Sequence, residues 1–509
     1  MLSFDRSNSV EGWAVAPGAG PRVGLAGVVG FVLAMTAPLG QLVGGAPVLL
    51  HAVGAAAFWS YLLATGLMLL FAFGLLAAAR RIVSAGGLVA FVGAAFGPRV
   101  QGAAVYLALA TYALAGCCTL AGFAALLHDL APMLPVPLIV VCHLAVVGAL
   151  GWREISLSIR MLATLLIAEI ACLLLLDLKI LAVAVVDGHL VMPHWNAAAA
   201  AAPGMGAAAL VWAIGSFGGF EAGLVFSEEA CAPRHKVPAA VLLAVAALGG
   251  VFGLTYFAIA NGCSARDMMD QAGHSSVGFL YGLDEHFLGH QAALVMRLLA
   301  MTSIFAASLG GQNVAARYWL VGARGGLLWG GLAATHPIWG SPHRGSTTQS
   351  VTLLLLMGAM LAAGADPMQQ ILPWCGALAG VATMTLYITS GCAVPLLLHR
   401  EHLLHGRWLQ GAVAPLAAAL SFLLLLAFAV RHAGLALHAA HMPAPLWLTL
   451  PMACIGGFVA AKQASTQLSD FLWQQRPRRT EMTPAVLSDD QDIVREFAAE
   501  PPFNCSNSR

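Results

Sequence analysis

About twelve apolar stretches divide the chain, and each is long enough to cross a lipid bilayer as a helix. A helical crossing takes about 20 predominantly apolar residues, because the hydrocarbon core of a bilayer is about 30 Å thick. We therefore expect an all-α membrane protein with about twelve transmembrane helices. The predicted spans are residues 24–50, 55–79, 101–127, 136–152, 159–183, 207–230, 238–261, 291–323, 350–365, 371–398, 410–431 and 444–464.

The composition agrees with lipid as the solvent for most of the chain. Of its 509 residues, 60% are hydrophobic and 9% are charged, against about 25% charged residues in soluble domains. A formal net charge of +1 gives no reason to expect nucleic acid as a partner. The ten cysteines contain no CxxC pair and the seventeen histidines contain no HExxH cluster, so we predict neither a metal site nor a cofactor.

Basic residues gather at one set of span ends, which predicts how the chain crosses the membrane. They are Arg22, Arg80, Arg81, Arg99, Arg153, Arg160, Arg234, Lys236, Arg324, Arg344, Arg400, Arg407 and Lys462. The opposite ends and loops hold Asp129, Asp177, Asp187, Asp267, Asp270, Asp284, Glu285 and Asp366. Lysine and arginine mark the cytoplasmic side of a membrane. We expect a multi-pass protein of the plasma (inner) membrane with both termini in the cytoplasm.

Composition also divides the chain into four parts. Residues 1–21 form a cytoplasmic segment without the apolar region of a signal peptide, so the first span is expected to direct its own insertion. Residues 22–400 hold the first ten spans and residues 401–466 the last two. Residues 467–509 are polar and charged, which predicts a disordered cytoplasmic tail.

The sixth span carries residues that a lipid-facing helix has no reason to hold. Within residues 210–229 these are Gly215, Ser216, Gly218, Gly219 and Glu221. Each glycine weakens a helix by about 1 kcal/mol relative to alanine. A carboxylate at bilayer depth costs several kcal/mol unless it faces a cavity or a partner, so ionisable residues there are functional candidates. The pattern predicts a broken helix that lines a binding site.

The first span has an interruption of its own, at Pro38. Proline removes a backbone donor and clashes with the preceding turn, so the helix should kink or unwind just before it. A simple proline kink is the alternative interpretation. Interrupted spans in corresponding positions of two halves are, however, a sequence sign of a transporter site between repeats. Spans one to five and six to ten would then be inverted repeats, with two extra helices.

Four sequence patterns follow one another along the chain in the same order as in one family of membrane proteins. The first two are Ala37-Pro-Leu with Gly44-Gly-Ala-Pro47, and Arg81 with Ser84-Ala-Gly-Gly87. The third is Phe217-Gly-Gly-Phe-Glu221 with Glu228-Glu229-Ala-Cys-Ala-Pro-Arg-His-Lys-Val-Pro238, and the fourth is Arg317-Tyr-Trp-Leu-Val-Gly-Ala-Arg-Gly-Gly326. Over roughly residues 20–400 the chain resembles the amino acid–polyamine–organocation permeases. The resemblance implies a LeuT-type fold of five-plus-five inverted repeats. It departs from the family where Thr36–Gly40 replaces G-S-G-I-F, and where Gly215 stands in place of an aromatic gate.

The two breaks offer opposite electrical poles for a zwitterion. Half-helix N-termini expose amides with partial positive charge, and C-termini expose carbonyls with partial negative charge. We assign the first break mainly to the substrate carboxylate and the second mainly to its ammonium group. The predicted substrate-binding residues are Thr36, Ala37, Pro38, Leu39 and Gly40 in the first break and Gly215, Ser216, Phe217, Gly218 and Gly219 in the second.

Two carboxylates within spans are candidates for coupling or gating. Glu221 follows the second break, where it either caps freed amides or acts as a gate that senses protons. Glu169 lies within the fifth span, where some relatives carry a lysine that replaces a sodium ion. It would serve proton coupling, with Ser303 in the same region, or pair structurally with Arg160 or Arg297.

These features together predict a secondary transporter for amino acids or related amines, driven by protons or by exchange. The alternative is a membrane sensor of amino acids that does not transport. An enzyme is not expected, because the chain has no GxSxG in a span, no paired aspartates and no His/Glu metal set. The expected partners are a small-molecule substrate and the lipid bilayer. The patterns leave open which substrate is carried, proton against sodium coupling, and the oligomeric state.

Overall fold

The computed structural model describes residues 24–153, 155–193, 205–230, 232–262, 278–404, 408–431 and 444–464. Within these ranges the chain forms helices joined by turns, and no strand occurs. The predicted N-terminal segment 1–21 and tail 467–509 lie outside the described residues.

Every predicted span has a helical counterpart, and the first and sixth spans are each divided in two. The helices are α1 (Leu25–Thr36), α2 (Pro38–Val53), α3 (Ala57–Ala79), α5 (Pro98–Leu130), α6 (Val136–Gly151), α7 (Ile155–Val186), α9 (Met205–Gly215), α10 (Ala222–Val225), α11 (Pro233–Gly262), α14 (His290–Arg324), α15 (His343–Ala362), α16 (Leu372–Arg400), α17 (Ala414–Arg431) and α19 (Ala444–Gln463). Eight helical stretches of the described chain are long and apolar enough to cross a membrane, and Val136–Gly151 and Leu448–Lys462 are shorter apolar helices.

Two short helices, α4 (Leu88–Phe96) and α13 (Gly278–Leu288), lie between the predicted spans. Each adjoins a glycine with positive φ, Gly87 at +49° and Gly289 at +92°. Such angles suit glycine and allow an abrupt change of chain direction. α13 folds back against α7 and α14, so its Asp284 is completely buried.

Two of the acidic residues assigned to span ends and loops are completely buried. Asp177 and Asp284 both have an exposed fraction of 0%. Asp177 lies inside α7, where the Thr255 hydroxyl of α11 donates a hydrogen bond of 2.8 Å to its carboxylate. Hydropathy cannot reveal this burial, because it depends on which neighbouring helix packs against each face.

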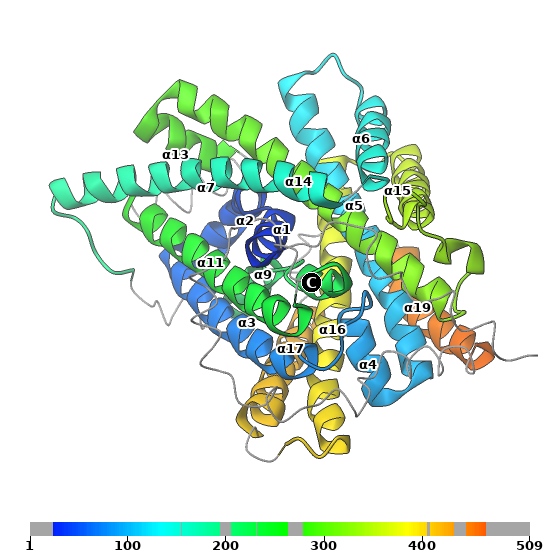
Figure 1. Ribbon diagram of the computed structural model, residues 1–509. Coiled ribbons are helices and arrows are strands. Elements are labelled where there is room, and N and C mark those ends of the chain that lie inside the picture. Colours follow the sequence, from blue (N-terminus) through cyan, green and yellow to red (C-terminus); the bar gives the residue numbers. More distant parts are fainter. Residues whose placement is uncertain are drawn as a thin grey trace, which may run out of the picture.

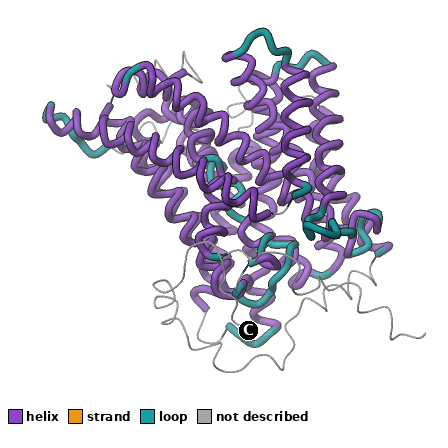
Figure 2. Tube along the Cα trace, turned by 45° about the horizontal axis from the view of Figure 1, so that its top comes forward, coloured by secondary structure: helices purple, strands orange, loops and turns teal. Residues whose placement is uncertain are grey.

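The divided first span is at the centre of the bundle (Figure 1). α1 packs against α7, α11 and α14, while α5 contacts α14, α16 and α19. α3 packs against α11 and α17 on another side. The loops lie mostly at the ends of the long helices (Figure 2). Both breaks are therefore enclosed by unbroken helices, which can hold unwound backbone in a fixed place.

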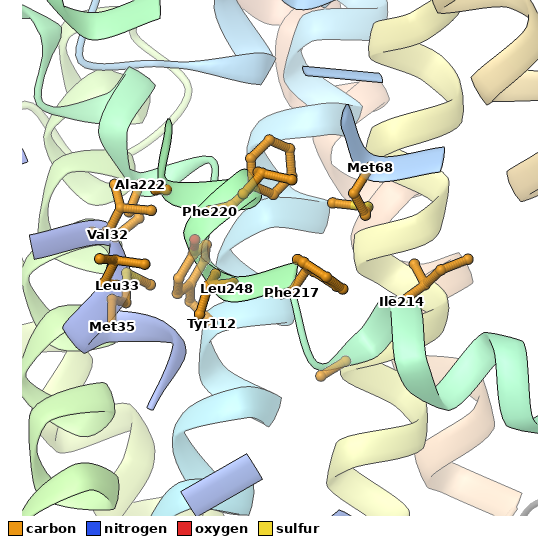
Figure 3. Packing of buried hydrophobic residues seen from close by; sticks show 14 of the residues in the cluster. Val32, Leu33, Met35, Met68, Tyr112, Ile214, Phe217, Phe220, Ala222 and Leu248 are labelled. Atoms are coloured by element: carbon orange, nitrogen blue, oxygen red, sulfur yellow. The ribbon is translucent and has the colours of Figure 1, made fainter. Parts of the chain in front are cut away.

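Close packing joins the two breaks (Figure 3). Phe217 and Phe220 of the second break are completely buried, and Met35 at the end of α1 belongs to the same cluster of buried side chains. A Cβ atom added to Gly219 would lie 3.4 Å from Met35, which is an ordinary contact distance, so the two breaks lie against each other here. Lipid is as apolar as these side chains, so close packing rather than escape from water stabilises the arrangement.

Candidate functional site

The first break is confined to a single residue, Ala37. α1 ends at Thr36 and α2 begins at Pro38, and Ala37 between them has φ 48° and ψ 66°. Proline disfavours the α conformation in the residue that precedes it, and Ala37 adopts the left-handed conformation instead. The Thr36 hydroxyl donates a 2.7 Å hydrogen bond to the Leu33 carbonyl and so satisfies part of the α1 end. The break predicted before Pro38 is confirmed.

A carboxylate from α7 occupies the start of α2. Glu169 accepts a 2.6 Å hydrogen bond from the Ser303 hydroxyl of α14 and another from the Leu39 backbone. The Gly40 amide donates to the Ser303 oxygen at 3.3 Å. Backbone amides at a helix N-terminus attract negative charge, which explains why a buried carboxylate is stable there. Glu169, Ser303 and residues 39–40 therefore form one cluster.

Of the two arginines that could pair structurally with Glu169, only the side chain of Arg297 is among those that the structure describes. Arg297 is directed at the ring of Tyr281, 5.1 Å from its centroid, and does not pair with Glu169. The side chain of Arg160 lies outside the described residues. Glu169 is 2% exposed, and its partners are a hydroxyl and a backbone amide.

The second break is longer. α9 ends at Gly215, and the chain turns through residues 216–221 before α10 begins. Gly219 has φ +99°, a conformation that side chains other than glycine rarely adopt. The Ser216 hydroxyl forms a 2.8 Å hydrogen bond with the Tyr61 hydroxyl of α3. The unwinding predicted from the glycines is confirmed.

Glu221 holds the second break to two other helices. Its Oε1 accepts from the Tyr112 hydroxyl of α5 at 2.8 Å, and its Oε2 accepts from the Tyr387 hydroxyl of α16 at 2.8 Å. The Gly219 amide also donates to Oε2, at 3.1 Å. Glu221 therefore binds an amide of the turn that precedes α10, and the predicted capping of the amides of the second half-helix is not observed. The two tyrosines were not identified from the sequence.

Open space adjoins both breaks. Gly44 of α2 and Gly215 at the end of α9 are exposed, and a Cβ atom added to either would meet nothing within 4 Å. Gly40 and Gly218 are half-buried, and a Cβ at either would have a neighbour at 3.0 Å. The other predicted binding residues are buried: Thr36, Ala37, Pro38, Leu39, Ser216, Phe217 and Gly219.

The ring of Phe217 packs against a neighbouring helix. Its ring is completely buried and meets the ring of Phe252 of α11 edge to face, with 5.8 Å between centroids. The side chain therefore anchors the break to α11. Only its backbone remains available to a ligand.

A family model described as amino acid permease matches residues 28–458, which include both breaks, Glu169 and Ser303. The chain belongs to the amino acid permease family. A solved structure of a mutant manganese transporter from Eremococcus coleocola superposes with a TM-score of 0.52 at 12% identity, over 89% of this chain and 95% of that one. At this identity the likeness shows the fold alone, which is the LeuT type. A search of curated proteins finds no match.

Family and fold together establish a multi-pass membrane protein that acts as a secondary transporter. The predicted all-α architecture with a five-plus-five repeat and two extra helices is confirmed. Among the described residues of the permease, no group of three or more His, Cys, Asp or Glu side chains could hold a metal ion.

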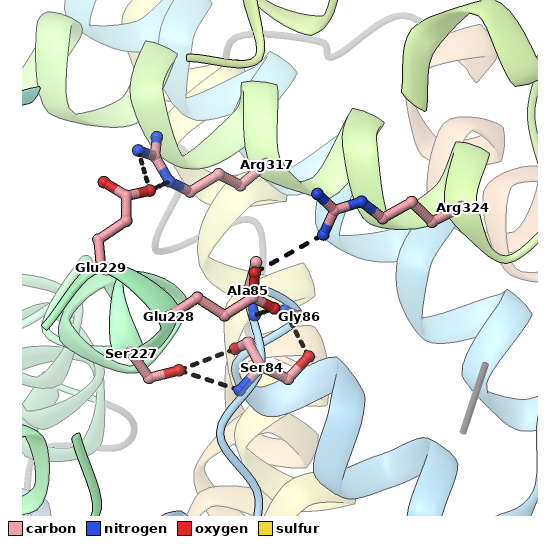
Figure 4. Close-up of polar contacts among 8 residues, drawn as sticks. All are labelled: Ser84, Ala85, Gly86, Ser227, Glu228, Glu229, Arg317 and Arg324. Carbon is pink, nitrogen blue, oxygen red and sulfur yellow. Dashed lines mark hydrogen bonds and ion pairs between the residues drawn. The ribbon is translucent and has the colours of Figure 1, made fainter. Parts of the chain in front are cut away.

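Beyond α10, ion pairs connect the second broken span of the permease to α14 (Figure 4). Arg317 binds Glu229 through two guanidinium nitrogens and lies 4.0 Å from the centre of the Phe226 ring. Arg324 reaches Glu228 at 3.6 Å. The Arg317 side chain is 5% exposed, so its pair is less screened by solvent than that of Arg324.

The loop after α3 joins the same network. Glu228 accepts a 2.8 Å hydrogen bond from the Ala85 amide, and Ser227 and Ser84 exchange bonds of 3.0 and 3.1 Å. Three segments that are distant in sequence are therefore fastened at one end of the bundle. We call Glu228, Glu229, Arg317, Arg324 and residues 84–85 the gate network.

Proposed function

We propose that this permease moves amino acids or related amines across the plasma (inner) membrane by alternating access. One observation carries the proposal: two interrupted spans meet inside the bundle, and exposed glycines adjoin both interruptions. In lipid, unwound backbone is tolerated only where protein buries it or where it lines a water-filled cavity. Gly44 and Gly215 are the positions at which a substrate would find room.

The electrical poles of the breaks suit a zwitterion. The amides at the start of α2, after Thr36–Pro38, would attract the carboxylate, and the carbonyls at the end of α9, around Gly215–Gly219, would attract the ammonium group. Backbone groups supply both poles, so the side chains of the two breaks play a small part in them. The space beside Gly215 would receive the variable part of the substrate.

Alternating access would follow from the gate network. By the distribution of basic residues along the sequence, that end of the bundle and both termini would lie in the cytoplasm. The partly buried Arg317–Glu229 pair would keep this side closed while the substrate enters from outside. Breaking it would free α10 and the loop after α3 to move away from α14. A rocking of the broken helices against the others would then release the substrate inward.

Coupling is assigned to the carboxylates beside the breaks. Glu169 and Ser303 lie at the first, and Glu221 lies at the second. Protonation of either carboxylate would weaken bonds that hold a broken span to its neighbours. We favour coupling to protons or exchange of one substrate for another. A sensor that binds amino acids without transport is the alternative.

The test is uptake by the purified protein in liposomes, with labelled amino acids and amines offered in the presence and absence of an inward proton gradient. Accumulation that depends on the gradient supports proton-coupled transport. Flux only against a preloaded substrate supports exchange. Binding without any flux would favour the sensor.

A matched pair of variants locates the site. Gly215→Trp should abolish uptake while the protein still folds, because the added Cβ meets nothing within 4 Å. Gly358→Trp in α15 is the control, since that glycine is equally open but lies away from both breaks. Uptake that survives Gly215→Trp would contradict the assigned site.

A further inference from the structure

The start of α2 is already occupied by a carboxylate of the protein itself. The Leu39 backbone bonds to Glu169, and the Gly40 amide reaches it through the Ser303 hydroxyl. We call these two amides and the Ser303 hydroxyl the carboxylate seat. One turn further along α2, Gly44 is exposed beside open space, so the seat lies next to the path proposed for the substrate.

Among the basic side chains that the structure describes, which do not include that of Arg160, none pairs with Glu169. On the elements packed against α7, Arg297 lies over Tyr281 and Tyr256 stacks on Tyr61. Arg317 binds Glu229, Arg324 binds Glu228, and His290 binds Glu285. On α7 itself, Asp177 bonds to Thr255, two turns away. Asp284 of α13 is a further carboxylate, not a counter-charge.

Two carboxylates cannot share such a seat while both are ionised. The seat offers a small set of donors, and like charges at contact distance repel each other strongly in a buried environment. A substrate carboxylate that approaches the α2 amides therefore has to displace Glu169. A displaced, buried and ionised Glu169 would lose its hydrogen bonds and remain charged, which is costly. Taking up one proton removes that cost.

We propose that Glu169 occupies the carboxylate seat in place of the substrate carboxylate. It leaves the seat to the substrate only when it takes up a proton. This inference rests on the proposed function. The proton comes from water on the side where the substrate enters and binds a carboxylate oxygen of Glu169, and no covalent bond of the substrate changes. One proton would therefore accompany each substrate that carries a carboxylate, whereas an amine without one would not require it.

The experiment compares binding of an amino acid and of its decarboxylated amine at acidic and mildly alkaline pH, with the full-length protein in detergent. For the unaltered protein, the Kd of the amino acid should fall by up to about tenfold for each unit of decreasing pH, as expected for one linked proton. The Kd of the amine should change little.

Glu169→Gln gives the decisive result. It removes the competing charge, so amino acid binding should become independent of pH and as tight as that of the unaltered protein at acidic pH. A residue that merely supports the fold would weaken binding when replaced. Asp177→Asn is the control, because it neutralises another buried carboxylate of α7 and should leave the pH dependence intact.

A second variant keeps the inference testable if Glu169→Gln fails to fold. Ser303→Ala removes a 2.6 Å donor that favours ionised Glu169, so the pH dependence of amino acid binding should shift to higher pH. Weaker binding by Glu169→Gln at every pH, or an unchanged pH dependence in both variants, would overturn the inference alone. If the unaltered protein binds no amino acid or amine, the proposed function fails and the inference with it.

Discussion

The two broken spans solve the same physical problem in opposite ways. At the first break the backbone supplies donors, through Leu39 and Gly40, and the carboxylate comes from α7. At the second break the broken segment supplies the carboxylate, Glu221, and the donors come mainly from α5 and α16. The first break can therefore bind a negative charge that another part of the molecule supplies. The second break carries its own negative charge, and the hydrogen bonds of that carboxylate hold the break in place.

From this difference we infer that the first break serves binding and that the second serves to anchor the broken span. The first break leaves the helical path for one residue and resumes at once, with the Gln41 amide donating to the Ala37 carbonyl at 2.9 Å. The second unwinds over residues 216–221 and depends on Tyr112 and Tyr387 for its position. We expect changes at the second break to affect folding and transport together, and changes at the first to affect mainly binding and coupling.

The largest effect should come from Glu221→Ala. It leaves three buried donors without an acceptor, and each unsatisfied group costs about 1–3 kcal/mol. The thermal midpoint should fall and uptake should be lost. Replacing Tyr112 and Tyr387 together by phenylalanine removes two of those donors. Glu221→Ala should therefore lower the stability of this double variant by less than it lowers the stability of the unaltered protein. A Glu221→Ala protein that transports normally would contradict the anchoring role.

An intermediate effect is expected from Gly219→Ala. The φ of +99° strains any side chain other than hydrogen, although the new methyl group would meet Met35 only at an ordinary contact distance of 3.4 Å. We expect a loss of about 1–3 kcal/mol, measured as a lower thermal midpoint. Gly215→Ala is the matched control, since its Cβ enters open space at the end of a helix and should leave stability nearly unchanged. Equal effects of the two changes would show that the break is not held in one conformation.

The sequence predicted the spans and both breaks because those features are local. Hydropathy sets the helices in lipid, Pro38 ends α1, and clustered glycines unwind the sixth span. The partners of the carboxylates could not be predicted in the same way. Tyr112 and Tyr387 lie in ordinary apolar helices, and only the packing of α5 and α16 brings them to Glu221.

The same limit applies to burial. In a soluble protein, alternation of polar and apolar residues shows which face of a helix is inside, but here lipid and protein interior are equally apolar. The packing of the Phe217 ring on Phe252, for example, could not be predicted from the sequence. Glu169 was recognised from its depth in a span, yet its seat on α2 depends on the crossing of α1, α7 and α14.

The smallest expected effect tests the backbone of the first break, at Ala37. A left-handed conformation costs a residue with a side chain roughly 1–2 kcal/mol, which Ala37→Gly would relieve. Against this, glycine increases the freedom of the unfolded chain by about 0.4–1 kcal/mol. A buried methyl group is also lost, and with it some packing. The thermal midpoint in detergent should therefore stay within a few degrees of that of the unaltered protein.

The control is Ala34→Gly, one turn earlier in α1 and equally buried. It relieves no left-handed conformation, and glycine inside a helix costs about 1 kcal/mol relative to alanine. If Ala37→Gly were as destabilising as Ala34→Gly, the first break would not be strained, and the contrast with the glycine-built second break would have to be abandoned.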